Sequence, residues 1–382
     1  MSQFFPKWSP KTFPKSRPRK DFVIFPKVNR ATAVRFLEAF CRLLDLSRQK
    51  VQTWYEAHTP LTILLSLFAI YVCTWMVSRH FVGESWGLVR VGNYLAIWIS
   101  IAMFLSLLIA VWLRRRWQIA ALFVLFSLTV YQNQLLAWAT PVVTSASPEN
   151  QLRIMTFNAH PTNQQMDELA ALILDSDLDV IALQEISDAA TVALMDTLAD
   201  EYPYAALDHQ LALLSRYPIR PLHVPSVMME SQLAIISLPE NDVYVWNVHA
   251  PTGLQKRIWK EQTRDLRIVA RHLTRTNDPV LLLGDLNTTA HNENYQLIAN
   301  HLTDTHTAAG KGLGLTYPAP DVVYTEVPSL SNHLEWLPTL FRIDYIFASD
   351  HWQVMDANVV EDGYGSDHLP IVATVALKQA AK

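Results

Sequence analysis

Three long runs without a charged residue limit what this chain can fold into. Residues 57–78, 91–113 and 117–148 contain no Asp, Glu, Lys or Arg and are rich in Leu, Ile, Val, Phe and Trp. Each run is long enough to cross about 30 Å of hydrocarbon as a helix. The sequence therefore argues against a wholly soluble protein and predicts an all-α membrane region of three transmembrane helices over residues 59–140.

Charge is distributed unevenly along the chain, although the formal net charge is only −4. Residues 1–58 hold 12 Lys and Arg against 4 Asp and Glu, whereas residues 141–382 hold 14 against 30. Basic residues near the ends of spans stay on the cytoplasmic side. The amino terminus is therefore predicted to be cytoplasmic, and the triple Arg114-Arg115-Arg116 agrees. Three crossings would place the acidic body outside the cytoplasm, in the periplasm if the source is bacterial.

The basic leader, residues 1–58, divides into two parts. A proline-rich stretch over residues 1–30 is typical of an extended arm. From Ala31 to about Tyr55, apolar residues at near-helical spacing suit a basic amphipathic helix on an anionic leaflet or an ordinary cytoplasmic helix packed on the spans. A cleaved signal peptide is disfavoured, because its apolar core would lie within roughly the first 15–30 residues.

After a short linker at residues 141–150, the pattern over residues 151–382 becomes that of an α/β domain with short apolar strands. Strands are predicted at Leu152–Phe157, Leu178–Leu183, Val243–Val248, Val280–Leu283, Ile343–Phe347 and Leu369–Val375, and helices at Met166–Leu174, Ala189–Leu198 and Gln255–Leu273. Several of the strands end in polar residues. Strand ends and adjoining loops are where such folds usually collect their chemistry.

Carboxylates, amides and imidazoles follow these strands, with no thiol among them. Taken singly, each has a plain explanation: Asn158 suits a turn, and Asp344 suits an ion pair with its neighbour Arg342. Together they supply hard oxygen ligands, which select Mg²⁺, Mn²⁺ or Ca²⁺, and imidazoles that move protons near neutral pH. The two cysteines, Cys41 and Cys73, lie outside this region and support neither a disulfide framework nor a Cys-based zinc site.

Seven short blocks follow the strands in order. They are Met155-Thr156-Phe157-Asn158, Ile181-Ala182-Leu183-Gln184-Glu185, Leu213-Leu214-Ser215-Arg216-Tyr217-Pro218-Ile219, Asn247-Val248-His249-Ala250-Pro251, Leu283-Gly284-Asp285-Leu286-Asn287, Arg342-Ile343-Asp344-Tyr345-Ile346-Phe347 and Gly365-Ser366-Asp367-His368-Leu369-Pro370. In this order they resemble the endonuclease/exonuclease/phosphatase superfamily, which includes pancreatic deoxyribonuclease, exonuclease III, neutral sphingomyelinases and inositol polyphosphate 5-phosphatases. The resemblance implies an α/β sandwich of two mainly antiparallel sheets with helices outside.

The resemblance also implies a role for each matching position. Glu185 would be the main ligand of Mg²⁺ or Mn²⁺, with Asn158 beside it and Asp367 contributing directly or through water. Asp285 would orient or deprotonate the attacking water. Asn287 would fix the geometry of that water and hydrogen-bond the phosphate.

Two imidazoles complete the implied site. His368 would contact the scissile phosphate, held in its tautomer by the carboxylate of Asp344, and His249 would face the phosphate as well. Because a phosphodiester repels anionic nucleophiles, metal and imidazolium must neutralise charge while water is aligned opposite the leaving oxygen. His249 disfavours an abasic-site repair enzyme, since the exonuclease III-like members generally place Tyr there.

Two further features carry weaker signals. Basic residues at helical spacing form a stripe that suits either a solvated outer face or a surface for substrate or lipid headgroups; they are Lys260, Arg264, Arg267, Arg271 and Arg275. The glycine-rich loop at residues 310–314 lacks the P-loop pattern. It is interpreted as a flap on the substrate side, where Lys311 would contact a phosphate.

These observations predict a membrane-anchored phosphoesterase that depends on a divalent metal and hydrolyses phosphodiesters by attack of water. Its partners would be membrane lipids, through the spans, and a phosphoester substrate such as a lipid headgroup, a small phosphodiester or nucleic acid. The acidic body disfavours a general affinity for polyanions. The alternatives are an extracytoplasmic nuclease, a phosphomonoesterase and a non-catalytic tethered binding module.

Overall fold

A computed structural model describes residues 60–133, 151–223, 227–320 and 338–378 of the chain. By its internal contacts the chain divides into two units, Met1–Ile63 and Leu64–Lys382, and nearly all of the described residues belong to the second. The predicted amphipathic helix of the leader and the linker at residues 141–150 lie outside the described residues.

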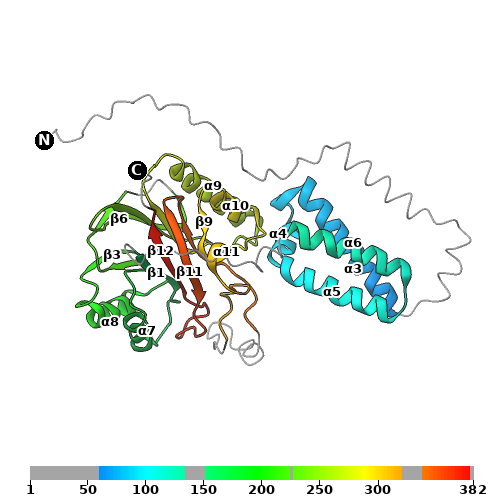
Figure 1. The fold of residues 1–382 in the computed structure, drawn as a ribbon, viewed down its shortest axis with the longest axis horizontal. Coiled ribbons are helices and arrows are strands. Elements are labelled where there is room, and N and C mark those ends of the chain that lie inside the picture. The colour runs from blue at the N-terminus through cyan, green and yellow to red at the C-terminus, as the bar shows by residue number, and fades with distance from the viewer. Residues whose placement is uncertain (1–59, 134–150, 224–226, 321–337, 379–382) are drawn as a thin grey trace, which may run out of the picture. The chain divides into compact units, whose positions relative to one another are not determined.

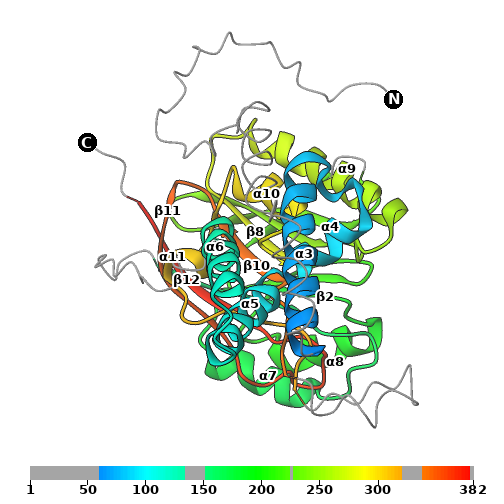
Figure 2. The same cartoon turned by 90° about the vertical axis from the view of Figure 1, so that its right-hand side faces the viewer.

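Helices account for the regular structure described before residue 134. They are α3 (Pro60–Phe81), the 3-10 turn η1 (Gly83–Ser85), α4 (Gly87–Tyr94), α5 (Ala96–Trp112) and α6 (Arg116–Gln132). The three longest, α3, α5 and α6, run side by side in both views (Figures 1 and 2). Buried side chains such as Trp75, Met103 and Leu122 pack between them.

The outward faces of these three helices are apolar as well. Large exposed side chains include Leu64, Leu67, Ile70, Phe104, Leu105, Leu108, Trp117, Phe123 and Val124. A helix that is hydrophobic on all sides belongs in the core of a large protein or in a membrane. These three helices are therefore apolar on both their packed and their outward faces.

The number of candidate spans differs from the prediction of three. Among the described residues, the 22-residue helix α3 is long and apolar enough to cross a membrane, and α4 with α5 makes a second candidate that is bent by 75°. The uncharged run 91–113 is thus not one straight helix. Its break follows from the polar start of the run, where Asn93 is buried and donates to the Glu84 carboxylate over 2.7 Å. Helix α6 has only 17 residues and is not among the candidate spans of the described part of the chain. The third span therefore stays a prediction.

Two six-stranded sheets form in the described part of residues 151–378. The first has the order β11-β12-β1-β2-β4-β3 and the second the order β5-β6-β7-β8-β10-β9. The strands are β1 (Gln151–Asn158), β2 (Val180–Gln184), β3 (Tyr204–Asp208), β4 (Leu211–Ser215), β5 (Ile219–Leu222), β6 (Glu230–Ser237), β7 (Asp242–His249), β8 (Val280–Asp285), β9 (Thr303–Asp304), β10 (Asp344–Ala348), β11 (Trp352–Val359) and β12 (Ile371–Leu377).

The sheets pack face to face and are covered by helices on their outer sides. Buried aliphatic side chains from both sheets, among them Ile154, Val245 and Leu281, fill the space between them. Helices α7 (Met166–Asp175) and α8 (Asp188–Leu198) pack on the outer face of the first sheet. Helices α9 (Lys256–Leu273) and α10 (Glu293–Ala299) cover the second (Figure 1), and the short α11 (Thr305–Ala309) follows β9.

This architecture confirms the predicted two-sheet α/β sandwich. All six predicted strands and all three predicted helices are present, with ends that shift by at most two residues. Each sheet contains one parallel pair, β1 with β2 and β7 with β8, and its other pairs are antiparallel. A central strand such as β2 is buried along its whole length, which explains its continuous apolar run.

Candidate active site

The two parallel strand pairs bring their carboxyl ends to one end of the sandwich. In the first sheet Asn158 ends β1 opposite Gln184, and Glu185 follows directly. In the second sheet His249 ends β7 opposite Asp285, the last residue of β8. Asp344 begins β10 and is also paired with Asp285, on its other side. Strand register alone therefore collects two carboxylates and an imidazole from the second sheet.

Glu185 and His249 meet across the two sheets. His249 Nε2 lies 3.1 Å from Glu185 Oε1, and Asn158 Nδ2 donates to the same oxygen over 2.9 Å. Burial opposes ionisation of Glu185, but the hydrogen bonds from His249 and Asn158 outweigh it and lower the pKa of Glu185 to about 2. Glu185 also adopts a left-handed backbone with φ of 52°, a conformation that is uncommon for non-glycine residues and concentrates at functional sites.

A further acid holds His249 from the opposite side. His249 Nδ1 lies 2.9 Å from Glu230 Oε2. Burial disfavours the imidazolium, but Glu185 and Glu230 together raise the pKa of His249 to about 10. Sequence analysis missed Glu230. Glu230 could have been found from the antiparallel pairing of β6 with β7, which sets Glu230 opposite His249. The strand β6 itself was not predicted.

Asp285 lies at the centre of the site and is fully buried. Its Oδ1 accepts the backbone N–H of Asn287 over 2.6 Å, and its Oδ2 accepts from the side-chain Nδ2 of Asn287 over 3.0 Å. The same Oδ2 lies 4.0 Å from His249 Nε2 and 3.9 Å from His368 Nε2. Burial and the nearby Asp344 carboxylate raise the pKa of Asp285 to about 7. Asp285 is therefore poised to exchange a proton near neutral pH.

His368 is paired with Asp344 as the resemblance implied. Its Nδ1 lies 2.9 Å from Asp344 Oδ2 and 3.1 Å from Oδ1. Burial disfavours the imidazolium, and the Asp344 charge outweighs it, so the pKa of His368 is raised to about 10. The alternative that Asp344 pairs with Arg342 is wrong, because the Arg342 guanidinium is bound to the buried carboxylate of Asp304.

The ring of Tyr317 covers the same imidazole, with centroids 4.9 Å apart. Nothing in the sequence distinguished Tyr317 from other tyrosines. With the carboxylate on one nitrogen and the ring packed against a tyrosine, His368 presents Nε2 toward Asp285.

A buried layer of amides lies beneath the site and joins the two sheets. Gln184 Nε2 donates to Asn247 Oδ1 over 2.7 Å, and Asn247 Nδ2 donates to the backbone carbonyl of Leu183 over 3.0 Å. Thr156 and Gln232 extend this layer on either side. Because such bonds are directional and both central amides are wholly buried, the layer fixes how one sheet lies against the other.

The side chains present fit a hard divalent cation. Two groups of three residues, Glu185 with His249 and Asp285, and Asp285 with Asp344 and His368, have potential ligand atoms within 4.8 Å of one another. Carboxylate oxygens dominate both groups, which suits Mg²⁺ or Mn²⁺ better than a soft metal.

Four predicted site residues stay outside these groups. Asn158 and Asn287 donate directly to members of them, to Glu185 and Asp285 respectively. Asp367 is half-buried beside His368, whose ionisation its charge favours, and its role as a ligand stays a prediction. Lys311 is exposed, and its backbone carbonyl lies 3.1 Å from His306 Nε2. The described contacts do not bring Lys311 to the catalytic centre.

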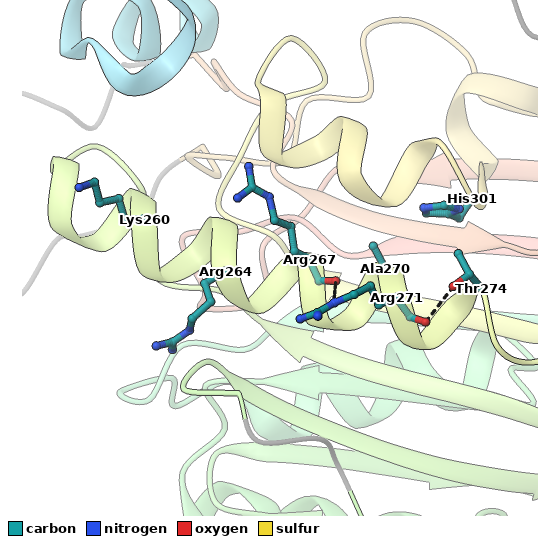
Figure 3. Close-up of a pocket in the computed structure, with 7 residues that line it drawn as sticks. All are labelled: Lys260, Arg264, Arg267, Ala270, Arg271, Thr274 and His301. Carbon is teal, nitrogen blue, oxygen red and sulfur yellow. Dashed lines mark hydrogen bonds between the residues drawn. The ribbon is translucent and has the colours of Figure 1, made fainter.

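The basic stripe forms a surface of its own on α9. Beside it lies a hollow of about 520 Å³, lined by Lys260, Arg264, Arg267, Ala270, Arg271, Thr274 and His301. Figure 3 draws these seven residues, which include every cation of the stripe except Arg275. Arg264 is bound to Asp265 over 2.8 Å, and the other cations of the stripe are exposed. The hollow includes no residue of the centre around Asp285, in agreement with a solvated outer face.

The sandwich and the carboxylates and imidazoles at its strand ends define the class of this protein as a phosphoric ester hydrolase of α/β-sandwich type. The chain belongs to the endonuclease/exonuclease/phosphatase family, whose model matches residues 155–368. This confirms the resemblance found in the sequence. The enzymes of this family depend on divalent metals. No curated protein matches the chain.

Three solved structures are similar to about three fifths of the chain. A family member from Beutenbergia cavernae has 24% identity and a TM-score of 0.43, with 60% of this chain and 72% of that chain covered. The sphingomyelinase C of Streptomyces griseocarneus has 18% identity and a TM-score of 0.44 over 59% and 99%. A mannosyl-6-phosphatase of Bacteroides thetaiotaomicron has 17% identity and a TM-score of 0.47 over 59% and 100%.

Proposed function

We propose that this protein is a membrane-anchored hydrolase of phosphodiesters that uses Mg²⁺ or Mn²⁺ and has its catalytic domain outside the cytoplasm. One observation carries the catalytic part. A single buried oxygen, Asp285 Oδ2, lies within 4.0 Å of the Nε2 atoms of both His249 and His368. A general base between two cationic imidazoles suits attack on an anionic phosphoester.

The residues divide the work as follows. Glu185, with Asn158 beside it, would hold the metal, which when bound neutralises phosphate charge and activates the electrophile. His249 and His368 face the position where that phosphate would lie, and their raised pKa values keep them cationic at neutral pH. Asp285 accepts the proton of the attacking water.

Asn287 orients this base. Its backbone N–H and its side-chain amide both donate to Asp285, and the amide nitrogen also donates to the carbonyl of Ala250 over 2.9 Å. The side-chain oxygen of Asn287 accepts from Thr252 Oγ1 over 3.2 Å. The Asp285 carboxylate is therefore held in one orientation, which reduces the entropic cost of aligning water.

A substrate panel on the purified full-length protein in detergent tests the proposed activity. The panel contains bis(p-nitrophenyl) phosphate, p-nitrophenyl phosphate, DNA, RNA, sphingomyelin and inositol phosphates, each with Mg²⁺, with Mn²⁺ and with EDTA. We expect the diesters to be hydrolysed faster than the monoesters, with loss of activity in EDTA and its return on adding Mg²⁺. Activity that is indifferent to EDTA would contradict metal dependence, and preference for monoesters would identify a phosphomonoesterase.

Glu185→Gln gives the matched test of the metal site. It removes one charge with little change in shape, so the half-saturating Mg²⁺ concentration should rise and turnover should fall, with partial rescue by excess metal. Glu201→Gln makes the same chemical change at an ion pair with Arg216 and should leave both values unchanged. Equal behaviour of the two variants would refute the assignment of Glu185.

The membrane anchoring is supported by α3 and by the apolar outward faces of α3, α5 and α6. The basic residues around Arg115 between α5 and α6 favour a cytoplasmic position for that turn. A reporter that is active only outside the cytoplasm should be active when fused after Lys382 and inactive when inserted at Arg115. The reverse pattern would refute the three-span topology.

A further inference from the structure

The connection between α3 and α5 is rich in buried polar side chains. Glu84 in η1 and Asn93 in α4 are each 1% exposed, and Arg90 is 4% exposed. Polar and charged groups persist in such positions only when they are hydrogen-bonded or paired. Most of their partners belong to the sandwich, within the same compact unit.

Glu84 makes the central contacts. Its Oε1 accepts from Asn292 Nδ2 over 2.6 Å, and its Oε2 accepts from the indole N–H of Trp259 over 3.2 Å. Its backbone N–H donates to Glu293 Oε1 over 2.9 Å. These partners lie at the amino-terminal ends of α9 and α10, which flank the loop carrying Asn287. Glu84 therefore docks the connection onto the two helices that frame the catalytic loop.

Two more side chains of this connection reinforce the docking. The Arg90 guanidinium donates to the backbone carbonyls of Glu84 over 2.6 Å and Leu254 over 3.3 Å, and it lies over the Trp259 ring. The backbone carbonyl of Asn93 accepts from Thr289 Oγ1 over 3.3 Å. The contacts thus extend into the loop that follows β8.

Tyr94, the last residue of α4, reaches the catalytic loop itself. Its hydroxyl donates to the backbone carbonyl of Asn287 in a short hydrogen bond. Asn287 has a left-handed backbone with φ of 46°. Its N–H and its side chain both donate to Asp285. Fixing the carbonyl of this residue therefore also fixes the groups that orient Asp285.

The neighbouring carbonyls show why Tyr94 matters at this position. The carbonyl of Leu286 accepts from Gln262 over 2.9 Å, and that of Thr288 accepts from Tyr345 over 2.9 Å. Both donors belong to the sandwich. The Asn287 carbonyl lies 3.5 Å from Gln262 Nε2, so its short hydrogen bond comes from the helical region.

We propose that the connection Gly83–Tyr94 completes the catalytic centre, with Tyr94 as a positioning residue for Asn287 and, through it, Asp285. This inference rests on the proposed hydrolase activity and adds that turnover depends on the helical region. A shift of about 1 Å in a catalytic group can lower the rate about 100-fold. Loss of one positioning hydrogen bond should therefore lower kcat by about 10-fold.

The test uses the full-length protein in detergent with bis(p-nitrophenyl) phosphate and Mg²⁺. Tyr94→Phe removes the hydroxyl alone and should lower kcat about 10-fold, with KM, the half-saturating Mg²⁺ concentration and the melting temperature nearly unchanged. Trp98→Phe is the matched control. It removes another single donor from the helical region, the indole that binds the carbonyl of Leu340 over 2.9 Å, and should leave kcat unchanged.

Glu84→Gln tests the docking by a second route. This substitution weakens the contacts to Trp259 and Asn292 and leaves the contacts of Asn287 unchanged. Like Tyr94→Phe, it should lower kcat. Wild-type kcat in both variants would overturn the positioning role, as would an equal loss in Trp98→Phe. If the proposed function is wrong, the wild-type protein itself will hydrolyse no substrate. That result differs from failure of the positioning role, in which the wild type and both variants are equally active.

Discussion

Replacing Asp344 by Asn should disable His368 while leaving the fold intact. The two side chains are 1% and 5% exposed, and their closest atoms are 2.9 Å apart. Unit charges at that separation interact with about 6 kcal/mol at an effective dielectric constant of about 20. Asn keeps a dipole and a hydrogen bond but loses the charge, and its amide can favour the wrong tautomer of the imidazole.

We expect Asp344→Asn and His368→Ala each to lower kcat at least about 100-fold, which corresponds to about 2.7 kcal/mol of transition-state stabilisation. Because the two residues act as one unit, the double variant should be scarcely slower than either single variant. Turnover and melting temperature are to be measured on the same preparations with a diester and saturating Mg²⁺. Asp304→Asn is the matched control, since it removes a buried carboxylate that binds Arg342 instead. It should lower the melting temperature and spare the turnover of folded molecules.

Two results would refute the reasoning about this pair. Rate losses that multiply in the double variant would show that Asp344 and His368 act independently. A lower melting temperature with unchanged turnover in Asp344→Asn would show that Asp344 only stabilises the fold.

Three more outcomes follow from the buried and half-buried contacts. Burial opposes ionisation of Asp304, but the charge of Arg342 outweighs it and lowers the pKa of Asp304. The ion pair therefore stabilises the fold at neutral pH, and this stabilisation is lost as pH falls through the folded-state pKa. Asp304→Asn should lower the free energy of unfolding, measured in urea, by about 3–5 kcal/mol at pH 7 and by less below about pH 4. Glu230→Gln removes an anion beside His249 and should move the alkaline limb of the kcat/KM profile to lower pH; an unmoved limb would contradict the pairing. Gly284→Ala should prevent the native fold from forming, so that no cooperative thermal transition is seen, because the added Cβ would lie 1.9 Å from a backbone oxygen of β7 and Gly284 has a φ of +135°. A normal melting curve would show that Gly284 does not lie so close to β7.

Central strands of the sandwich could be predicted because they are buried on both faces, whereas the arrangement in two sheets came from the family resemblance. A strand such as Val180–Gln184 appears in the sequence as a short apolar run that ends at a polar residue, and it was predicted to within two residues, at Leu178–Leu183. Six of the described strands were missed, and two of them, Leu211–Ser215 and Glu230–Ser237, also carry buried apolar runs. Ile219–Leu222 is half-buried or exposed along its length, so hydropathy does not distinguish it from a loop.

Site residues could be predicted where they lie at a strand end or within one of the seven sequence blocks. Residues that contact the site from other segments could not be predicted. Glu230 contacts His249 from the neighbouring strand β6, and Tyr317 packs on His368 from a segment earlier in the chain; the local sequence at both positions is ordinary. Hydropathy also gave no sign that Glu84 and Tyr94, in the connection after α3, contact the sandwich. The alternative that Asp344 pairs with Arg342 was suggested only by adjacency in sequence, which cannot reveal that Arg342 is bound to Asp304.

The amide layer between the sheets has a consequence for how this enzyme would fail on heating. Aliphatic side chains between two sheets tolerate sliding, because the hydrophobic effect has no preferred direction. The bond from Gln184 to Asn247 does not tolerate it, since a small shear would strand buried amides without partners. Glu185 directly follows β2 and His249 ends β7, and this bond ties these two strands together. Slippage of one sheet against the other would therefore separate the two halves of the catalytic centre at the same moment as it opens the core, so activity and native structure should disappear over the same narrow range of temperature.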